Sequence, residues 1–319
     1  MDEFSLIDRF WQPLGDAVAR SEVVEGIGND GAVVRCPPGR DQVMTMDTLV
    51  EGVHFPRNMP AHALGWRALA VNLSDLAAMG AEPLCFTLSV TLPEASESWL
   101  AALADGMQSL AVRENVQLVG GDTTRGPLSI TIQAHGLLPE GSALRRGAVT
   151  PGDQVCVSGT LGEAGEALNW LEATGAPAPA VAAVLERYRY PQPRLALGQW
   201  LRASGAVAVD VSDGLVADLS HLLGERGARL EWGALPVSSE LVALRGEEEA
   251  RRLAASAGDD YELLFVWPAD QPLPPEPVDS LALTVIGTVT EEPGVTLMGP
   301  EGRVELAQQG YTHFGGRHG

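Results

Sequence analysis

The sequence predicts an α+β protein of two layered α/β domains, with residues 1–138 as the first and residues 139–319 as the second. The chain of 319 residues is 45% hydrophobic, which is enough to bury a large core. Runs rich in β-branched residues alternate with segments of helical periodicity in both halves, as in layered α/β proteins. A segment rich in helix and strand breakers, "PEGSALRRGAVTPGD", separates the two halves.

The first half predicts one compact unit whose clearest element is a helix in the segment 61–83. Leu69, Leu73 and Leu76 share one face of this helix, and Gly80 supplies its stop. The expected elements are, in order, a helix at 4–20, a hairpin of strands 32–36 and 42–50, the helix at 61–83, a strand at 83–93, a helix at 96–115, a strand from 116 that runs into the loop "GGDTTRG", and a strand at 128–138.

The second half predicts a further alternation of strands and helices. Its expected elements are a strand at 154–159, a helix near 162–173, an Ala/Pro-rich loop at 174–180, a helix at 194–204, a strand at 206–212, a helix at 214–226, and strands at 261–268 and 282–291.

The charge of the chain restricts its partners and its chemistry. The net charge is −21, and all 21 basic residues are arginine. We expect no nucleic-acid or anionic-membrane binding, since both need a basic face. The lack of lysine excludes a Walker-type P-loop, a β3-lysine protein kinase, Schiff-base enzymes and pyridoxal phosphate chemistry. Phosphates must therefore be handled by arginine, backbone N–H groups or bridging divalent cations.

The expected location is the cytoplasm. No run of 18 apolar residues could span a membrane, and the acidic N-terminus lacks the order of a secretory signal. Cys36, Cys85 and Cys156 are scattered without a C-x-x-C motif, which is typical of reduced core thiols.

Gly26, Gly28 and Gly31 have the G-x-G-x-x-G spacing of a dinucleotide-binding loop. Such a loop needs a helix that opens at its third glycine, because the helix N-terminus holds the pyrophosphate. Here a short β-branched run and the breaker Pro-Pro-Gly follow Gly31, so no crossover helix fits. We interpret the glycines as a flexible loop that presents Asp30.

Aspartates, most of them at strand-to-loop junctions, form the main functional pattern. They are Asp30, Asp47, Asp75, Asp122, Asp210, Asp213, Asp259 and Asp260. Asp75 differs because it lies inside a helix beside Leu73 and Leu76, where a carboxylate needs hydrogen bonds, a counter-charge or a metal. Scattered carboxylates suit Mg²⁺, which keeps waters and bridges to phosphate oxygens, whereas the histidine spacing does not suit zinc.

Local alternatives stay open for several of these residues. Asp75 can bond a neighbouring helix N-cap, Asp122 can serve a Gly-Asp turn, and Ser212 or Asp213 can cap the following helix. The pair at 145–146 is either a phosphate contact or a solvated pair of arginines.

Seven segments in this order resemble the thiamine-monophosphate kinase family, whose superfamily includes aminoimidazole ribonucleotide synthetase and selenophosphate synthetase. The segments are "GIGNDGAVV", "TMDTLVEGVHF", "RALAVNLSDLAAMGAEP", "GGDTTRGPLSITI", "DVSDGLVADL", "GDDYELLF" and "GYTHF". They cover essentially the whole chain.

The resemblance implies ATP-dependent phosphorylation of thiamine monophosphate to thiamine diphosphate by a homodimer whose N-terminal sheets join, with several Mg²⁺ ions holding ATP. The implied metal ligands are Asp30, Thr45, Met46, Asp47, Asp75, Asp122, Asp210 and Asp213, of which Asp122 and Asp210 are also expected to be catalytic. The implied ATP side comprises Gly121, Asp122, Arg146 and Ser212. The implied substrate side comprises His54, Asp259, Asp260, Tyr311 and Phe314.

Three departures from the family pattern leave the metal count open. Asn29 replaces one of two adjacent aspartates, Met46 replaces a small hydroxyl residue, and Asp259 replaces a glutamate. The expected mechanism is direct in-line transfer to an acceptor phosphate that is already ionised. Two alternatives are a superfamily enzyme that forms an acyl phosphate and a non-catalytic dimer that binds metal or nucleotide.

Overall fold

The computed structural model describes residues 3–147, 149–273, 278–306 and 310. The chain divides into unit 1, which comprises Met1–Ala143 and Arg189–Leu195, and unit 2, which comprises Leu144–Tyr188 and Ala196–Gly319. Within unit 1, Trp66 Nε1 donates a hydrogen bond to the Pro191 carbonyl at 2.9 Å, which anchors the returning segment. The sequence did not predict this return, and the domain limits at 138 and 139 stay a prediction.

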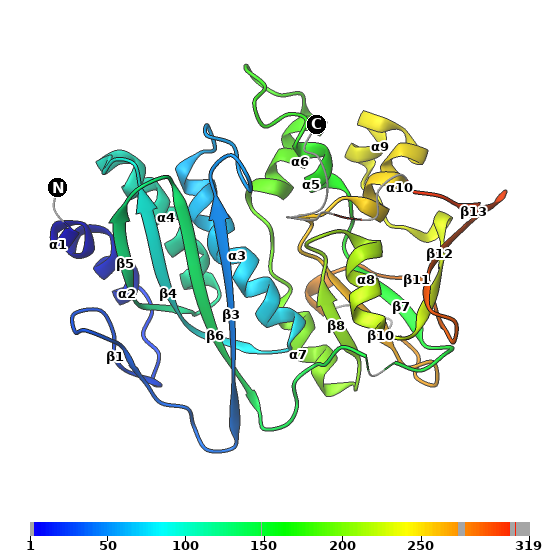
Figure 1. Cartoon of the computed structure of the whole chain (residues 1–319), viewed down its shortest axis with the longest axis horizontal. Helices are drawn as coiled ribbons and strands as arrows, with labels where there is room; N and C mark the ends of the chain where they lie inside the picture. Colours follow the sequence, from blue (N-terminus) through cyan, green and yellow to red (C-terminus); the bar gives the residue numbers. More distant parts are fainter. Residues whose placement is uncertain (1–2, 148, 274–277, 307–309, 311–319) are drawn as a thin grey trace. The chain divides into compact units, whose positions relative to one another are not determined.

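Unit 1 is built on a four-stranded mixed sheet (Figure 1). Its strands, in spatial order, are β3 (Arg40–Val50), β6 (Ser129–Pro139), β4 (Glu82–Leu92) and β5 (Gln117–Arg125). Strands β4 and β5 are parallel, and the other two pairs are antiparallel.

Helices α3 (Ala61–Ala78) and α4 (Glu97–Arg113) pack against each other on one face of this sheet (Figure 1). Leu69, Leu73 and Leu76 of α3 are fully buried, as their spacing predicts. On the opposite face of β3, Met44 and Met46 are 61% and 58% exposed. The predicted N-terminal helix is three short pieces instead, namely α1 (Glu3–Leu6), a π-helical turn (Ile7–Trp11) and α2 (Gln12–Asp16).

Two predictions about strands in unit 1 are wrong. The expected hairpin between 32–36 and 42–50 does not form, because β2 (Val33–Val34) pairs with β1 (Val23–Glu25) while β3 pairs along its whole length with β6. The segment "GGDTTRG" is not a loop, since β5 continues to Arg125 by parallel pairing with β4.

Unit 2 is built on a seven-stranded mixed sheet. Its spatial order is β13 (Gly302–Val304), β12 (Gly294–Gly299), β9 (Gly227–Glu231), β11 (Leu283–Thr290), β7 (Gln154–Ser158), β10 (Leu263–Trp267) and β8 (Val207–Asp210). Its helices are α5 (Glu163–Ala167), α6 (Pro179–Arg189), α7 (Leu195–Ala203), α8 (Leu215–Leu223), α9 (Ser239–Arg245) and α10 (Glu247–Ser256). The alternation in both units confirms the α+β class.

Helices α6, α9 and α10 and strands β9, β12 and β13 were not predicted. Pro179 was assigned to a loop but is the first residue of α6, a position where the missing N–H costs nothing. Helix α10 buries only small side chains, those of Ala250, Ala254 and Ala255, so its apolar stripe is weak in the sequence. Among the described residues, no helix has the length and apolar character needed to cross a membrane.

Candidate functional site

Three predicted cation ligands come together where α3 packs on β3. Thr45 and Asp47 alternate with exposed Met46 along β3, so their side chains point toward α3. Thr45 Oγ1 donates a hydrogen bond to Asp75 Oδ2, and the Asp47 amide donates to Asn72 Oδ1 at 3.0 Å. Asn72 lies three residues before Asp75 on the same helix, so one face of α3 fixes both ligand-bearing positions of β3.

The electrostatics of this group favour a bound cation. Burial, together with the smaller effect of the neighbouring Asp75 carboxylate, raises the pKa of Asp47 to about 6. Over the described part of the chain, no three His, Cys, Asp or Glu side chains form a metal-binding group. The donor set at α3 and β3 is therefore two carboxylates and the Thr45 hydroxyl, which suits Mg²⁺ because that ion keeps several waters and binds phosphate oxygens.

Asp122 does not belong to the same group. In the strand register Asp122 is opposite Ser89 of β4, and Ser89 is opposite Thr131 of β6. The Thr131 hydroxyl contacts that of Thr48 at 2.9 Å on the face away from α3. Asp122 therefore lies on that face too. Asp47 lies on the other face and three strands away, about 14 Å at the usual strand spacing. One ion cannot contact both carboxylates within this chain.

The backbone beside Asp122 requires a glycine. Gly121 has φ +154°, and a Cβ added there would lie 1.8 Å from the Leu88 carbonyl oxygen. On the helix-covered face, Trp11 Nε1 donates a hydrogen bond to Thr123 Oγ1 at 3.0 Å. These contacts hold the strand on both sides of exposed Asp122, so the Gly-Asp turn considered above is not present.

The other predicted residues of unit 1 lie at the periphery. Asp30 is exposed in the connection between β1 and β2. Gly31 leads into β2 rather than into a helix, which confirms that the glycines at 26–31 do not form a dinucleotide-binding loop. His54 Nδ1 accepts a hydrogen bond from the Val50 amide at 3.0 Å, so the neutral ring carries its proton on Nε2.

In unit 2, Asp210 is the last residue of β8 and is buried. The amides of Ser212, Asp213 and Gly214 all donate hydrogen bonds to Asp218 Oδ2, at 3.1, 3.0 and 3.0 Å. Gly214 occupies the N-cap of α8 without a side-chain bond, so neither Ser212 nor Asp213 caps this helix. Burial raises the pKa of Asp218 to about 6, against the lowering effect of the amides.

The predicted substrate loop is tied to this segment by backbone hydrogen bonds. The Asp259 amide donates to the Ser212 carbonyl, and the Tyr261 amide donates to the Val211 carbonyl, both at 2.9 Å. Asp259 and Tyr261 have φ values of +69° and +51°, which non-glycine residues adopt at an energetic cost. Strain of this kind concentrates at functional sites, which supports a role for the loop.

The two adjacent acids of this loop differ in what they contact. Asp260 is buried, and its carboxylate accepts hydrogen bonds from the amides of Gly162 and Ala164 at 2.6 and 3.3 Å. Burial raises the pKa of Asp260 to about 8. Asp259 is half-buried and accepts a hydrogen bond from the Tyr261 hydroxyl at 3.1 Å. Asp260 thus supports the loop from within, whereas Asp259 is the more exposed of the two.

Arg146 is exposed and lies apart from Ser212. The neighbouring Gly147 amide donates to the Leu222 carbonyl at 2.9 Å, near the end of α8 opposite to the 212–214 segment. The nine residues of α8 span about 13 Å, so Arg146 and Ser212, the predicted ATP contacts of unit 2, lie roughly a helix length apart. Tyr311 and Phe314 lie outside the described residues.

Sequence reasoning missed five supporting residues. Asn72 and Asp218 anchor the backbones described above, while fully buried Glu262 accepts from Ser158 Oγ at 2.5 Å and pairs with Arg187 at 2.8 Å. A signal was present for Asp218, because Leu215, Leu219 and Leu222 place it on the apolar face of its helix.

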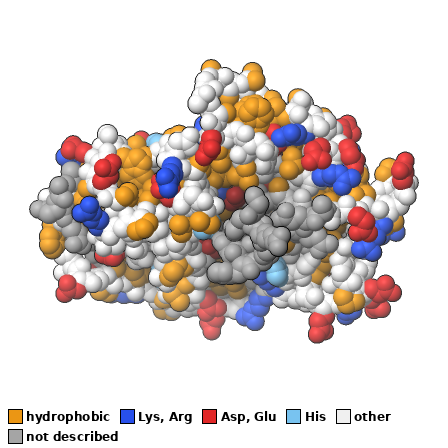
Figure 2. Space-filling model, turned by 45° about the horizontal axis from the view of Figure 1, so that its top comes forward, with side chains coloured by type: hydrophobic (Ala, Val, Ile, Leu, Met, Phe, Trp, Pro, Cys, Tyr) orange, Lys and Arg blue, Asp and Glu red, His pale blue; other side chains and the backbone are white. Residues whose placement is uncertain are grey.

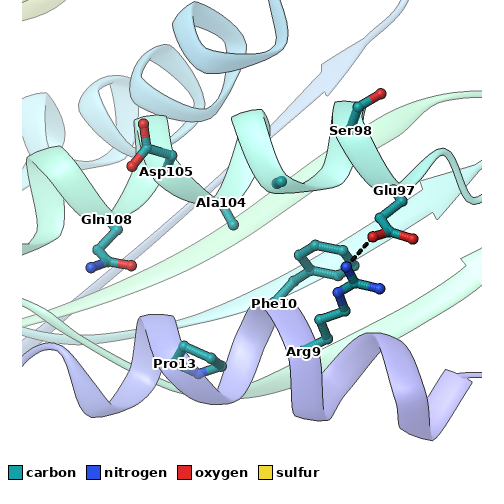
Figure 3. Close-up of a pocket in the computed structure, with 9 residues that line it drawn as sticks. Arg9, Phe10, Pro13, Glu97, Ser98, Ala104, Asp105 and Gln108 are labelled. Carbon is teal, nitrogen blue, oxygen red and sulfur yellow. Dashed lines mark hydrogen bonds and ion pairs between the residues drawn. The ribbon is translucent and has the colours of Figure 1, made fainter.

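A cavity of about 600 Å³ lies elsewhere on unit 1, between the N-terminal helical segment Glu3–Asp16 and α4 (Figure 3). Phe10 and Pro13 face Ala104 and Gln108 across it, and an ion pair joins Arg9 to Glu97. None of its lining residues is a predicted site residue. On the face drawn in Figure 2, the described arginines stand among carboxylates rather than in a continuous basic surface.

Comparison with known proteins shows similarity over the whole chain. Residues 28–138 match the family model for the AIR synthase related protein, N-terminal domain. The chain is 40% identical over 323 residues to a thiamine-monophosphate kinase of Escherichia coli K12, with 98% of each protein covered. It is 42% identical to one of Salmonella typhimurium, over 83% of this chain and 82% of the relative.

Two solved structures are similar in fold and sequence. The thiamine-monophosphate kinase of Stenotrophomonas maltophilia K279a superposes with a TM-score of 0.83 at 42% identity, covering 93% of this chain and 96% of the other. AaThiL complexed with AMPPCP and TMP superposes with a TM-score of 0.78 at 30% identity, covering 98% and 97%.

Proposed function

Because the chain belongs to the thiamine-monophosphate kinase family, we infer that it phosphorylates thiamine monophosphate to thiamine diphosphate with ATP as the phosphoryl donor. The observation that carries this inference is 40% identity to a curated member over 98% of both chains. The related complex with AMPPCP, an analogue of ATP, and TMP supports the same pair of substrates.

The first cation site is proposed at Thr45, Asp47 and Asp75. Asn72 and the Thr45 hydrogen bond hold the donor oxygens in place before any substrate binds. Bound Mg²⁺ would supply the positive charge that a lysine-free acidic chain lacks, and so lower the repulsion between two phosphates. The separation of Asp122 from Asp47 supports more than one cation, with Asp30, Met46, Asp122, Asp210 and Asp213 as the remaining proposed ligands.

The phosphoryl group is proposed to pass directly and in line to the acceptor phosphate. That acceptor is ionised at neutral pH, so the chain needs no general base, and its task is to position two anions. Asp122 and Asp210 are proposed to act at the reacting phosphates. On the substrate side we favour Asp259 over Asp260, together with His54, Tyr311 and Phe314, where an aromatic ring would stack on the cationic thiazolium.

The predicted homodimer is proposed to form through the open face of the sheet of unit 1. Exposed Met44 and Met46 on that face support this, since long apolar side chains favour burial. Light scattering at micromolar concentration should give twice the chain mass of 33.6 kDa, and Met44→Glu with Met46→Glu should give the monomer. A monomeric wild type would contradict the proposal. A cytoplasmic location stays a prediction.

The activity is tested by phosphorus NMR of purified protein with ATP, Mg²⁺ and thiamine monophosphate. We expect the diphosphate pair of thiamine diphosphate to appear with ADP and to be lost with a chelator. The Asp122→Asn variant should turn over about 10³-fold more slowly, and Glu94→Gln, the same charge change at an exposed position, should be unaffected. Consumption of ATP only with another acceptor would favour an acyl-phosphate enzyme, and binding without turnover would favour a sensor.

A further inference from the structure

The buried carboxylate of Asp218 determines the course of the loop that carries Asp210, Ser212 and Asp213. One atom, Asp218 Oδ2, accepts three consecutive amides, and the side chain is only 4% exposed. Hydrogen bonds to an ionised acceptor are roughly twice as strong as those between neutral groups. Three peptide units therefore depend on one acceptor, and its loss would leave all three donors without it at once.

These hydrogen bonds also determine which groups of the loop are available to bind a nucleotide. Free amides in front of a helix commonly bind phosphate, because they add to the positive end of the helix dipole. Here the amides of 212–214 are already bonded to Asp218, so they are not available to a phosphate. What the loop offers instead is side chains, namely the Ser212 hydroxyl and the carboxylates of Asp210 and Asp213, and the two carboxylates bind cations rather than anions.

The loop is held from its other side as well. The Ser212 carbonyl accepts the Asp259 amide, and a Cβ added at Gly258 would lie 2.2 Å from the same carbonyl oxygen. Displacement of the 212–214 segment would therefore disturb the proposed substrate loop.

We infer that Asp218 is a positioning residue for phosphoryl transfer, which fixes the 211–214 backbone so that Asp210, Ser212 and Asp213 hold the cation that carries ATP. The inference rests on the proposed function, yet its structural half can be tested alone. Amide hydrogen exchange of the wild type should be slow at 212–214 compared with the exposed 174–176 segment. Equally fast exchange would overturn the inference whatever reaction the protein catalyses.

The functional half is tested with two variants. Asp218→Asn keeps an oxygen acceptor without its charge, and Asp218→Ala removes the acceptor. We expect the half-saturating concentration of Mg²⁺–ATP to rise about 10-fold in the first and more in the second, with faster exchange confined to 211–214 and 258–262. If Asp218→Ala fails to fold, Asp218→Asn and the wild-type exchange still decide the question.

A matched control is Ser238→Ala in the same unit. It removes the Ser238 Oγ that accepts the Leu241 amide at 3.1 Å and caps α9, so it should lower the melting temperature without changing Mg²⁺–ATP saturation. The inference is wrong if Asp218→Asn saturates within about twofold of the wild type. It is also wrong if the control loses Mg²⁺–ATP affinity as much as Asp218→Asn does.

Discussion

Asp47→Asn should stabilise the metal-free protein while it abolishes turnover. Burial and Asp75 raise the pKa of Asp47 from 3.8 to about 6, so the folded chain resists ionising this carboxyl. A shift of about two units corresponds to roughly 3 kcal/mol at pH values above 6. Within the described residues the Asp47 carboxylate accepts no hydrogen bond that the amide would lose. The variant should therefore melt about 5–10 °C higher in chelator at pH 7.5.

The sign of the pH dependence follows from linkage. Because the folded pKa is above the unfolded one, the wild type binds more protons when folded and loses stability as pH rises from about 4 to 6. The amide does not titrate, so the advantage of Asp47→Asn should be full above pH 6 and nearly absent at pH 4. Added Mg²⁺ should raise the melting temperature of the wild type and should do so much less in the variant.

The assay is thermal unfolding in chelator at pH 4, 5, 6 and 7.5, with and without Mg²⁺, beside steady-state kinetics. Glu94→Gln makes the same charge change at an exposed position of unit 1 and controls for relief of the overall net charge of −21. A variant less stable than the wild type at pH 7.5 would refute the reasoning. So would a gain of the same size at pH 4, since it could not come from the ionisation of Asp47.

Two further predictions test packing and burial. Gly121→Ala should cost several kcal/mol of stability because its methyl group would clash with the Leu88 carbonyl. Gly120→Ala should be tolerated far better, because no atom lies within 4 Å of the added carbon. Urea unfolding of both variants checks this. Cys36 is exposed and should be the one thiol that a disulfide reagent modifies rapidly in the native chain. Cys85 and Cys156 should react slowly, because burial raises their pKa values to about 11 and about 12. Rapid modification of all three thiols would contradict this.

The elements predicted best from the sequence are those with long periodic signals. The segment 61–83 gave α3 with the expected buried face, and 128–138 gave β6. The wrong predictions concern segments whose structure is set by pairing with residues far away in the sequence. The strand at 40–50 pairs with 129–139 and not with its neighbour at 33–34, and no local turn signal contains that information. Tertiary pairing likewise extends β5 through two glycines that predict a loop.

The candidate site was predictable in its residue types but not in its grouping. Carboxylates near strand ends indicate cation chemistry, yet the faces of Asp47 and Asp122 depend on the strand order β3-β6-β4-β5, which places three strand spacings between them. That order arises from pairing between residues far apart in the chain. The division of the proposed ligands into separate groups is therefore a property of the folded sheet and could not be inferred from spacing along the sequence.

One criterion applied to Asp75 would also have found Asp218. Each is an aspartate on the apolar face of a helix, and such a residue must find a partner, because a buried carboxylate without one is too costly. The partners differ: Asp75 accepts the Thr45 hydroxyl and stands beside a second acid, whereas Asp218 accepts three amides. An acid next to an acid favours a cation, and an acid among N–H donors fixes a backbone. The sequence identifies the aspartate that needs a partner. Only the fold shows whether that aspartate binds a cation or fixes a backbone segment.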